Sequence, residues 1–306
     1  MTQTGDGAAA IAVEDIRKSY GDLKAVDGVS FSVAEGEFFG ILGPNGAGKT
    51  TTLEIVEGLR EPDSGSVRLL GESPFPRKMA LLPRIGVQLQ ASSFFEKLTA
   101  REQLETFASL YGVGAVKANE MLELVGLADK ANTREDKLSG GQRQRLSIAC
   151  ALVHDPDVVF LDEPTAALDP QARRNLWDVL RAIQERGKTI LYTTHYLDEA
   201  EILCDRVAIM DEGRILALNA PATLVRGLDA PTHVLLEKGA LALETAESLP
   251  GVESATLDEV SLSISTREPV KVLSALAERG NLDGLQVRTA TLEDVFLQLT
   301  GREYRA

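Results

Sequence analysis

The first half of the chain alternates between short apolar strands and helix-like patterns. Strands are predicted at residues 10–13, 29–33 and 38–42, and the last of these leads directly into a glycine-rich loop. A helix over residues 50–58 is predicted to follow the loop and to end at Gly58. From residue 98 to residue 152 apolar side chains recur at helical spacing, which indicates a helical segment packed on a core.

Strands return after this helical segment. They are predicted at residues 158–161, 189–193 and 207–210, with a helix around residues 173–186 between the first two. Parallel strands joined by helices are typical of an α/β protein whose sheet is buried on both faces.

The pattern changes after about Leu224. The predicted order is βαββαβ, with strands at residues 233–237, 252–257, 260–264 and 285–289 and helices at 240–249 and 269–279. A final helix over residues 291–300 is predicted to be capped by Thr291 and Asp294 and to end at Gly301. This order predicts a small α+β domain of the ferredoxin-like kind. We therefore expect a disordered tail at 1–10, a large domain at 11–224 and an accessory domain at 225–306.

Composition narrows the class of protein. The 306 residues are 44% hydrophobic and 25% charged, which is ordinary for a globular protein. The formal net charge of −14 disfavours binding to nucleic acid, so no nucleic-acid partner is expected. Two distant cysteines suggest inert thiols in a reduced compartment. Because no apolar run reaches the roughly 18 residues of a membrane-spanning helix, any work at a membrane would need another chain to span it.

The glycine-rich loop matches the phosphate-loop template at every fixed position. It reads GPNGAGKT and consists of Gly43, Pro44, Asn45, Gly46, Ala47, Gly48, Lys49 and Thr50, followed by Thr51 in the helix. Glycines let backbone N–H groups converge on phosphate oxygens, and the helix N-terminus favours the same anion. Lys49 supplies a charge for the β- and γ-phosphates, and the Thr50 hydroxyl suits Mg²⁺. The loop therefore predicts a nucleoside triphosphate site; a plain glycine turn before a helix is the alternative.

A second motif places two carboxylates at the end of an apolar strand. VVFLDE spans residues 158–163, and α/β sheets bind ligands at the carboxyl ends of their strands. Asp162 is the expected Mg²⁺ ligand, and Glu163 is positioned to orient or deprotonate the attacking water.

Between these two motifs lies LSGGQ, residues 138–142. The combination resembles the ABC (ATP-binding cassette) ATPases over roughly residues 11–224. The resemblance implies a P-loop NTPase fold with a RecA-like core and with antiparallel β and helical subdomains. It also implies ATP and Mg²⁺ as cofactors, and two ATP molecules sandwiched between the phosphate loop of one subunit and LSGGQ of a second.

The resemblance assigns further site residues. Tyr20 occupies the position that stacks on adenine, and Gln90 falls at the Q-loop, where it reaches Mg²⁺ and the water. His195 matches the switch histidine that contacts the γ-phosphate, beside Glu163 in catalysis. The LSGGQ residues Ser139, Gly140, Gly141 and Gln142 would meet the nucleotide of the partner subunit, and Asp169 matches the D-loop of the nucleotide-binding site.

The last helix resembles the tail of daunorubicin-resistance-type cassettes that serve ABC-2 exporters, through TLEDVFLQLTGR at residues 291–302. This implies an ATPase subunit at the cytoplasmic face of the cell membrane, working with a separate ABC-2-type permease and exporting a drug or hydrophobic compound. The subunit is expected to act as a dimer, most simply of two identical chains. Phe94, Phe95 and Leu98 are candidate permease contacts, although core packing explains them equally well. The alternatives are a soluble ABC ATPase acting on nucleic acid or ribosomes, and a regulatory module that binds ATP without turnover.

Overall fold

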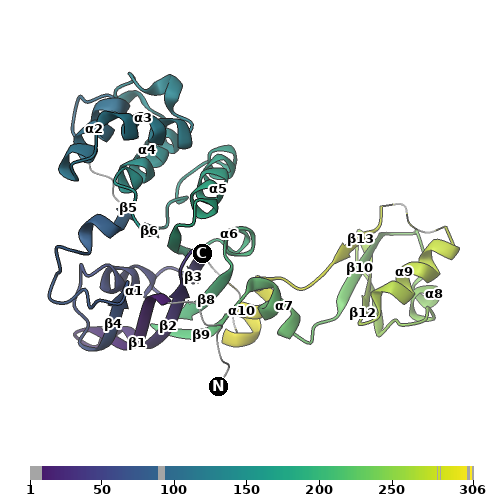
Figure 1. Ribbon diagram of the computed structural model, residues 1–306. Helices are drawn as coiled ribbons and strands as arrows, with labels where there is room; N and C mark the ends of the chain where they lie inside the picture. Colours follow the sequence, from purple (N-terminus) through teal and green to yellow (C-terminus); the bar gives the residue numbers. More distant parts are fainter. Residues whose placement is uncertain (1–8, 89–93, 281, 283, 302–303, 305–306) are drawn as a thin grey trace. The chain divides into compact units, whose positions relative to one another are not determined.

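The computed structural model describes residues 9–88, 94–280, 282, 284–301 and 304 (Figure 1). The chain forms two compact units, the first ending at Pro221 and the second beginning at Ala222. We describe each unit separately. No helix within the described residues is long and apolar enough to cross a membrane.

The first unit contains a six-stranded sheet in the order β5-β6-β7-β3-β8-β9. Its strands are β3 (Phe38–Leu42), β5 (Ile85–Gln88), β6 (Val158–Asp162), β7 (Thr189–Thr194), β8 (Arg206–Asp211) and β9 (Arg214–Asn219). All neighbouring strands are parallel except β9, which pairs antiparallel with β8. The predicted parallel α/β sheet is therefore confirmed, while β5 and β9 were not predicted.

A second, antiparallel sheet of the same unit has the order β2-β1-β4. It consists of β1 (Ala9–Tyr20), β2 (Leu23–Ala34) and β4 (Ser64–Leu69). The expectation of a disordered tail to residue 10 is wrong at its end, because β1 already includes Ala9 and Ala10. Ala9 pairs with Ala34, and Ala10 is 1% exposed and accepts a backbone hydrogen bond from Leu70 N at 2.7 Å. Residues 1–8 lie outside the described residues.

The first unit also contains several helices. They are α1 (Lys49–Val56), α2 (Ala100–Leu110), α3 (Ala115–Leu124), α4 (Gly140–Leu152), α5 (Pro170–Glu185) and α6 (Leu197–Leu203), with 3₁₀ turns at Leu82–Arg84, Ala128–Lys130 and Glu135–Lys137. Helix α1 and the antiparallel sheet cover one face of the six-stranded sheet, and α4 and α5 cover the other. Figure 1 shows α2, α3 and α4 grouped together as a helical subdomain.

Alternate side chains of each buried strand enter different cores. In β6, Val158 and Phe160 pack with the antiparallel sheet and α1, whereas Val159 and Leu161 pack with α4, α5 and the helical subdomain. All five residues of β3 and all five of β6 are buried, which explains why β3 and the first four residues of β6 carry no charged side chain. Burial on both faces holds the carboxyl ends of these strands in fixed positions.

The second unit has the predicted βαββαβ order. After α7 (Pro221–Gly227) it contains β10 (Thr232–Glu237), α8 (Leu243–Glu247), β11 (Ser254–Leu257), β12 (Ser261–Thr266), α9 (Pro269–Glu278), β13 (Gln286–Arg288) and α10 (Leu292–Thr300). Its four strands pair antiparallel in the order β11-β12-β10-β13, which is the split βαβ arrangement of a ferredoxin-like fold. Helix α8 covers residues 243–247 of the predicted 240–249, and a turn at Gly239, with φ of 93°, precedes it.

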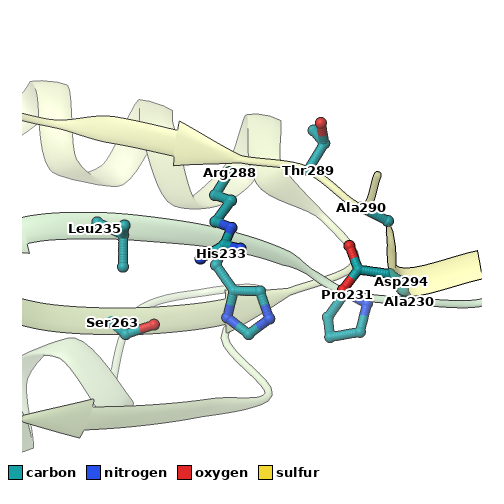
Figure 2. Close-up of a pocket in the computed structure, with 9 residues that line it drawn as sticks. All are labelled: Ala230, Pro231, His233, Leu235, Ser263, Arg288, Thr289, Ala290 and Asp294. Carbon is teal, nitrogen blue, oxygen red and sulfur yellow. The ribbon is translucent and has the colours of Figure 1, made fainter. Parts of the chain in front are cut away.

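The alternation of serine with apolar residues in β12 reflects a sheet with one covered face. Leu262 and Ile264 lie in the core beneath α8 and α9, and the intervening serines are half-exposed. The other face holds a shallow pocket of about 360 Å³, whose lining includes His233 and Ser263 (Figure 2). The predicted final helix is also confirmed, because Thr291 and Asp294 form a capping box at the start of α10 and Gly301, with φ of 69°, ends it.

Candidate nucleotide-binding site

The phosphate loop joins β3 to α1, as the sequence predicts. Gly46 and Gly48 have φ values of 82° and 99°, which side chains rarely adopt. A Cβ on Gly43 would lie 2.2 Å from the Met210 carbonyl oxygen, so the backbone there tolerates only glycine. The Lys49 ammonium donates to the carbonyl oxygens of Gly43 at 2.9 Å and of Pro44 at 3.1 Å. The loop is thereby wrapped around its own lysine at the N-terminus of α1, an arrangement that suits a phosphate group.

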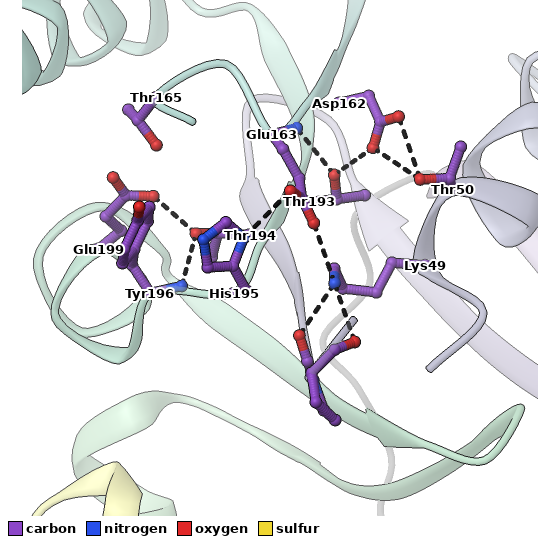
Figure 3. Close-up of polar contacts among 12 residues, drawn as sticks. Lys49, Thr50, Asp162, Glu163, Thr165, Thr193, Thr194, His195, Tyr196 and Glu199 are labelled. Atoms are coloured by element: carbon purple, nitrogen blue, oxygen red, sulfur yellow. Dashed lines mark hydrogen bonds and ion pairs between the residues drawn. The ribbon is translucent and has the colours of Figure 1, made fainter. Parts of the chain in front are cut away.

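Asp162 and Thr50 face each other at the end of β6 (Figure 3). The Thr50 hydroxyl donates to Asp162 Oδ2 at 3.1 Å, and the Thr193 hydroxyl donates to Oδ1 at 2.6 Å. Burial raises the pKa of the Asp162 carboxyl, and the charge of Glu163 adds to the rise, while the two hydroxyls oppose it. A carboxylate in this position calls for a cation, and a hydroxyl and a carboxylate are oxygen ligands that suit Mg²⁺.

Glu163 is paired at both carboxyl oxygens. Oε1 lies 3.0 Å from the Lys49 ammonium, and Oε2 lies 3.0 Å from His195 Nδ1. The Glu163 backbone has φ of 44°, and its amide donates to the Thr193 hydroxyl at 3.0 Å. An unfavourable backbone conformation held by neighbours is common at functional sites. The structure therefore brings together Lys49, Glu163 and His195 from three different elements.

The LSGGQ segment begins helix α4. Ser139 is the N-cap, its hydroxyl accepts from Gln142 N at 3.3 Å, and Gln142 Oε1 accepts from Ser139 N at 2.9 Å. A Cβ on Gly141 would lie 2.8 Å from the Ala172 side chain of α5, so this glycine allows the two helices to approach closely. Within the part of the chain that the structure describes, the Ser139 and Gln142 side chains make no hydrogen bond to the phosphate loop. Within the described residues of this chain, LSGGQ therefore does not form part of the hydrogen-bonded arrangement at the phosphate loop.

The remaining predicted site residues lie at the edges of this arrangement. Asp169 is exposed and caps α5 by accepting from Ala172 N at 2.8 Å. Tyr20 ends β1, is 43% exposed and carries the Arg60 guanidinium 5.4 Å from its ring centroid. Gln90 lies outside the described residues.

Residues 193, 194 and 199 were not predicted as part of the site. Thr193 binds both Asp162 and the Glu163 amide, and Thr194 and Glu199 are hydrogen-bonded beside His195. The signal in the sequence was the pair of threonines that ends β7, next to the strand ending in Asp162. Two hydroxyls at the carboxyl end of a buried strand are candidates for ligand or network contacts.

A cavity of about 370 Å³ lies beside the helical subdomain, lined mainly by apolar side chains that include Phe94 and Phe107. Phe94 is half-buried against the core, whereas Phe95 is 49% exposed and its ring centroid lies 6.0 Å from that of Phe107. Glu57 also lines the cavity. Burial raises the pKa of this carboxyl from 4.5 to about 8, aided by repulsion from Asp162.

The fold and the site together define a P-loop nucleotide-binding protein. A family model described as ABC transporter matches residues 26–166. The chain is 44% identical over 301 residues to a Nod factor export ATP-binding protein I of Paraburkholderia xenovorans (strain LB400), covering 96% of this chain and 98% of the relative. A protein of the same name from Rhizobium sp. (strain N33) is 40% identical over 299 residues, with the same coverage.

Solved structures agree with this relationship. A nucleotide-free ATP-binding cassette from an ABC transporter superimposes with a TM-score of 0.65 at 25% identity, covering 72% of this chain and 94% of that one. A dimeric cassette in a post-hydrolysis state, bound to ADP and phosphate, gives a TM-score of 0.62 at 29% identity, covering 69% and 98%. The chain belongs to the ABC transporter family, as an ATP-binding subunit of the kind that hydrolyses ATP to drive transport.

Proposed function

We propose that this chain is the ATP-hydrolysing motor subunit of an ABC exporter of the ABC-2 type. The observation that carries the proposal is the convergence of Lys49, Glu163 and His195 at the phosphate loop, within 3.0 Å contacts. The export direction is supported by the relatives, which are named for Nod factor export. A dimer is supported by the cassette solved as a dimer with ADP and phosphate.

Each residue of the site has a proposed role. Backbone N–H groups of the loop from Gly43 to Thr51, other than Pro44, hold the phosphates, and Lys49 exchanges its ion pair with Glu163 for the β- and γ-phosphates. Mg²⁺, which neutralises phosphate charge when bound, would be held by Thr50, Asp162 and Gln90. Glu163 accepts a proton from the attacking water, and His195 orients the γ-phosphate.

The other half of the site comes from a second copy of the chain. We propose that Ser139, Gly140, Gly141 and Gln142 of one subunit meet the γ-phosphate held by the other, with Asp169 alongside. The helix N-terminus and the Ser139 hydroxyl suit an anion. Tyr20 would stack on adenine through the ring face that Arg60 leaves open. ATP then stabilises only the closed dimer, and hydrolysis removes that stabilisation.

The dimer would work with a separate membrane permease at the cytoplasmic face of the cell membrane. The exposed Phe95 and the cavity lined by Phe94 and Phe107 provide an apolar surface for the permease. The tail resemblance favours a drug or hydrophobic compound as the exported substrate.

Complementation between two inactive variants tests the dimer mechanism. Lys49→Ala removes the phosphate charge and Ser139→Arg blocks the opposite half-site, so each purified variant should lack ATPase activity. In a head-to-tail dimer of one chain of each kind, both defects fall in one site and the other site is intact. Mixing the variants should therefore restore up to about a quarter of the parental activity. A mixture that stays inactive would contradict the shared site.

The membrane partner needs a second experiment. Co-expression with an ABC-2-type permease from the neighbouring reading frame should place the chain in a detergent-purified complex whose ATPase responds to the exported compound. Recovery with ribosomes or DNA instead would favour the soluble alternative.

A further inference from the structure

Glu199, on α6, is a fully buried carboxylate near His195 that the proposed mechanism does not use. Its Oε2 accepts two short hydrogen bonds, from the Tyr192 hydroxyl at 2.6 Å and from the Thr194 hydroxyl at 2.6 Å. Burial and the Glu199 charge raise the pKa of Tyr192 well above its usual value, so that hydroxyl remains a donor. Hydrogen bonds to a charged acceptor are stronger than neutral ones, and a buried charge without them would be costly.

The carboxylate dictates how the turn around His195 is hydrogen-bonded. A carboxylate only accepts, so the single hydroxyl proton of Thr194 points to Glu199. The lone pairs of the Thr194 hydroxyl oxygen then accept the Tyr196 N–H, at 2.9 Å. His195 lies between these two residues, and Figure 3 shows Glu199, Thr194 and Tyr196 on one side of its ring, with Glu163 on the other.

Arg173 supplies the matching positive charge from α5. Its Nε lies 3.7 Å from Glu199 Oε1, and its guanidinium carbon lies 3.9 Å from the centroid of the Tyr196 ring. The Tyr196 ring in turn lies 4.1 Å from that of His195. The backbone N–H of Arg173 bonds Asp169 O at 2.9 Å, so this cation is one turn from the cap of α5. Two paths therefore lead from Glu199 to His195, one through Thr194 and one through Arg173 and Tyr196.

We propose that Glu199 is a positioning residue for ATP hydrolysis, which holds the Thr194–Tyr196 turn so that the His195 imidazole meets Glu163 and the reacting phosphate. The proposal rests on the proposed function, because it assumes that His195 acts on ATP. The Thr194 backbone carbonyl accepts the Gly43 N–H of the phosphate loop at 3.3 Å. Loss of the Thr194 hydroxyl keeps this backbone contact with the nucleotide pocket but allows His195 to move. The effect therefore falls on kcat and not on ATP affinity.

Thr194→Val and Tyr192→Phe form a matched pair for the test. Each variant deletes one hydroxyl that donates to Glu199 Oε2 at 2.6 Å, from a side chain that is buried in both cases. Only Thr194 also accepts the Tyr196 N–H. Steady-state ATPase should show kcat lowered by at least about 10-fold in Thr194→Val with KM unchanged, and within about 2-fold of the parent in Tyr192→Phe. Thr194→Ser keeps the hydroxyl and should restore kcat.

A double-mutant cycle with His195→Ala shows whether the effect passes through the histidine. If it does, adding Thr194→Val to His195→Ala causes no further loss in single-turnover hydrolysis, because the two changes act as a unit. Glu199→Gln is measured in the same cycle, and it should lower kcat with KM unchanged and cause no further loss in the His195→Ala background; a Glu199→Gln chain with parental kcat would overturn the proposal. Equal losses from Thr194→Val and Tyr192→Phe, or losses that multiply in the His195→Ala background, would overturn the proposal. A parent chain without ATPase activity would overturn the proposed function as well, so the two failures are distinguishable.

Discussion

Glu57→Gln should make the stability of the first unit less dependent on pH. Glu57 follows the last residue of α1, is 6% exposed, and neither of its carboxyl oxygens has a hydrogen-bond partner within the described residues. Burial is the main reason that its pKa rises from 4.5 to about 8, with repulsion from Asp162 and Glu54 adding to it. Glutamine has nearly the same shape as the protonated acid and cannot ionise.

The sign and the size follow from proton linkage. Between pH 4.5 and about 8 the folded chain keeps a proton on Glu57 that the unfolded chain has released. The contribution of this group to the free energy of unfolding is therefore fully present below pH 4.5, and it is lost as pH rises to about 8. At about 1.4 kcal/mol for each pKa unit, the whole change approaches about 5 kcal/mol. The variant lacks this fall, so its stability relative to the parent should rise by roughly 3–5 kcal/mol between about pH 5 and pH 8.5.

Urea unfolding without nucleotide or Mg²⁺ measures the effect. Trp177 is the single tryptophan of the chain and packs against the core of the first unit from α5, so its fluorescence reports on this unit. Glu61→Gln makes the same chemical change at an exposed loop position and serves as the control. The control and parent curves should run parallel with pH, while the Glu57→Gln curve diverges from them. If the Glu57→Gln curve also runs parallel to the parent curve, Glu57 is not a buried acid with a raised pKa.

Three further predictions concern the site and the core. Glu163→Gln should lower kcat for ATP by about 10² to 10⁴-fold, because the general base is lost, while a fluorescent ATP analogue still binds; parental turnover would exclude Glu163 as the base. Gly141→Ala should cost about 1–3 kcal/mol in thermal unfolding because its Cβ meets a side chain of α5 at 2.8 Å, whereas a Cβ on Gly140 meets nothing within 4 Å and Gly140→Ala should be neutral. Burial raises the pKa of the Cys150 thiol to about 12, so iodoacetamide should label it at neutral pH only after unfolding; rapid labelling of the folded chain would contradict its burial.

The sequence was most informative where chemistry and local structure depend on the same residues. The loop from Gly43 to Thr50 needs its glycines for both backbone shape and phosphate approach, so the motif predicted strand, loop and helix at once. The strand predicted at residues 260–264 carries serine at alternate positions with Leu262 and Ile264, which fits a strand with one covered face because its side chains point to opposite faces. These features depend only on neighbours in the chain.

The sequence did not predict strands whose apolar and polar residues show only a weak alternation. Strand β9 alternates exposed and half-buried positions, and β5 has only four residues, so neither contrasts strongly with a loop. Ala10 fell both in the predicted tail and in the strand predicted at residues 10–13, and Ala9 was placed in the tail alone. Pairing of Ala9 with Ala34, far away in the sequence, makes it a strand.

The sequence by itself determined which chemical groups this protein has: a phosphate loop, two carboxylates after a buried strand, LSGGQ and a histidine after another strand. The tertiary structure decided how they are paired. Glu163 contacts both Lys49 and His195, and Glu199 accepts a hydrogen bond from Thr194 in the turn that carries His195. The Glu57 carboxyl has no hydrogen-bond partner among the described residues. Burial and hydrogen bonding arise between elements far apart in the chain, such as those that carry Lys49 and Glu163, so no local sequence pattern predicts them.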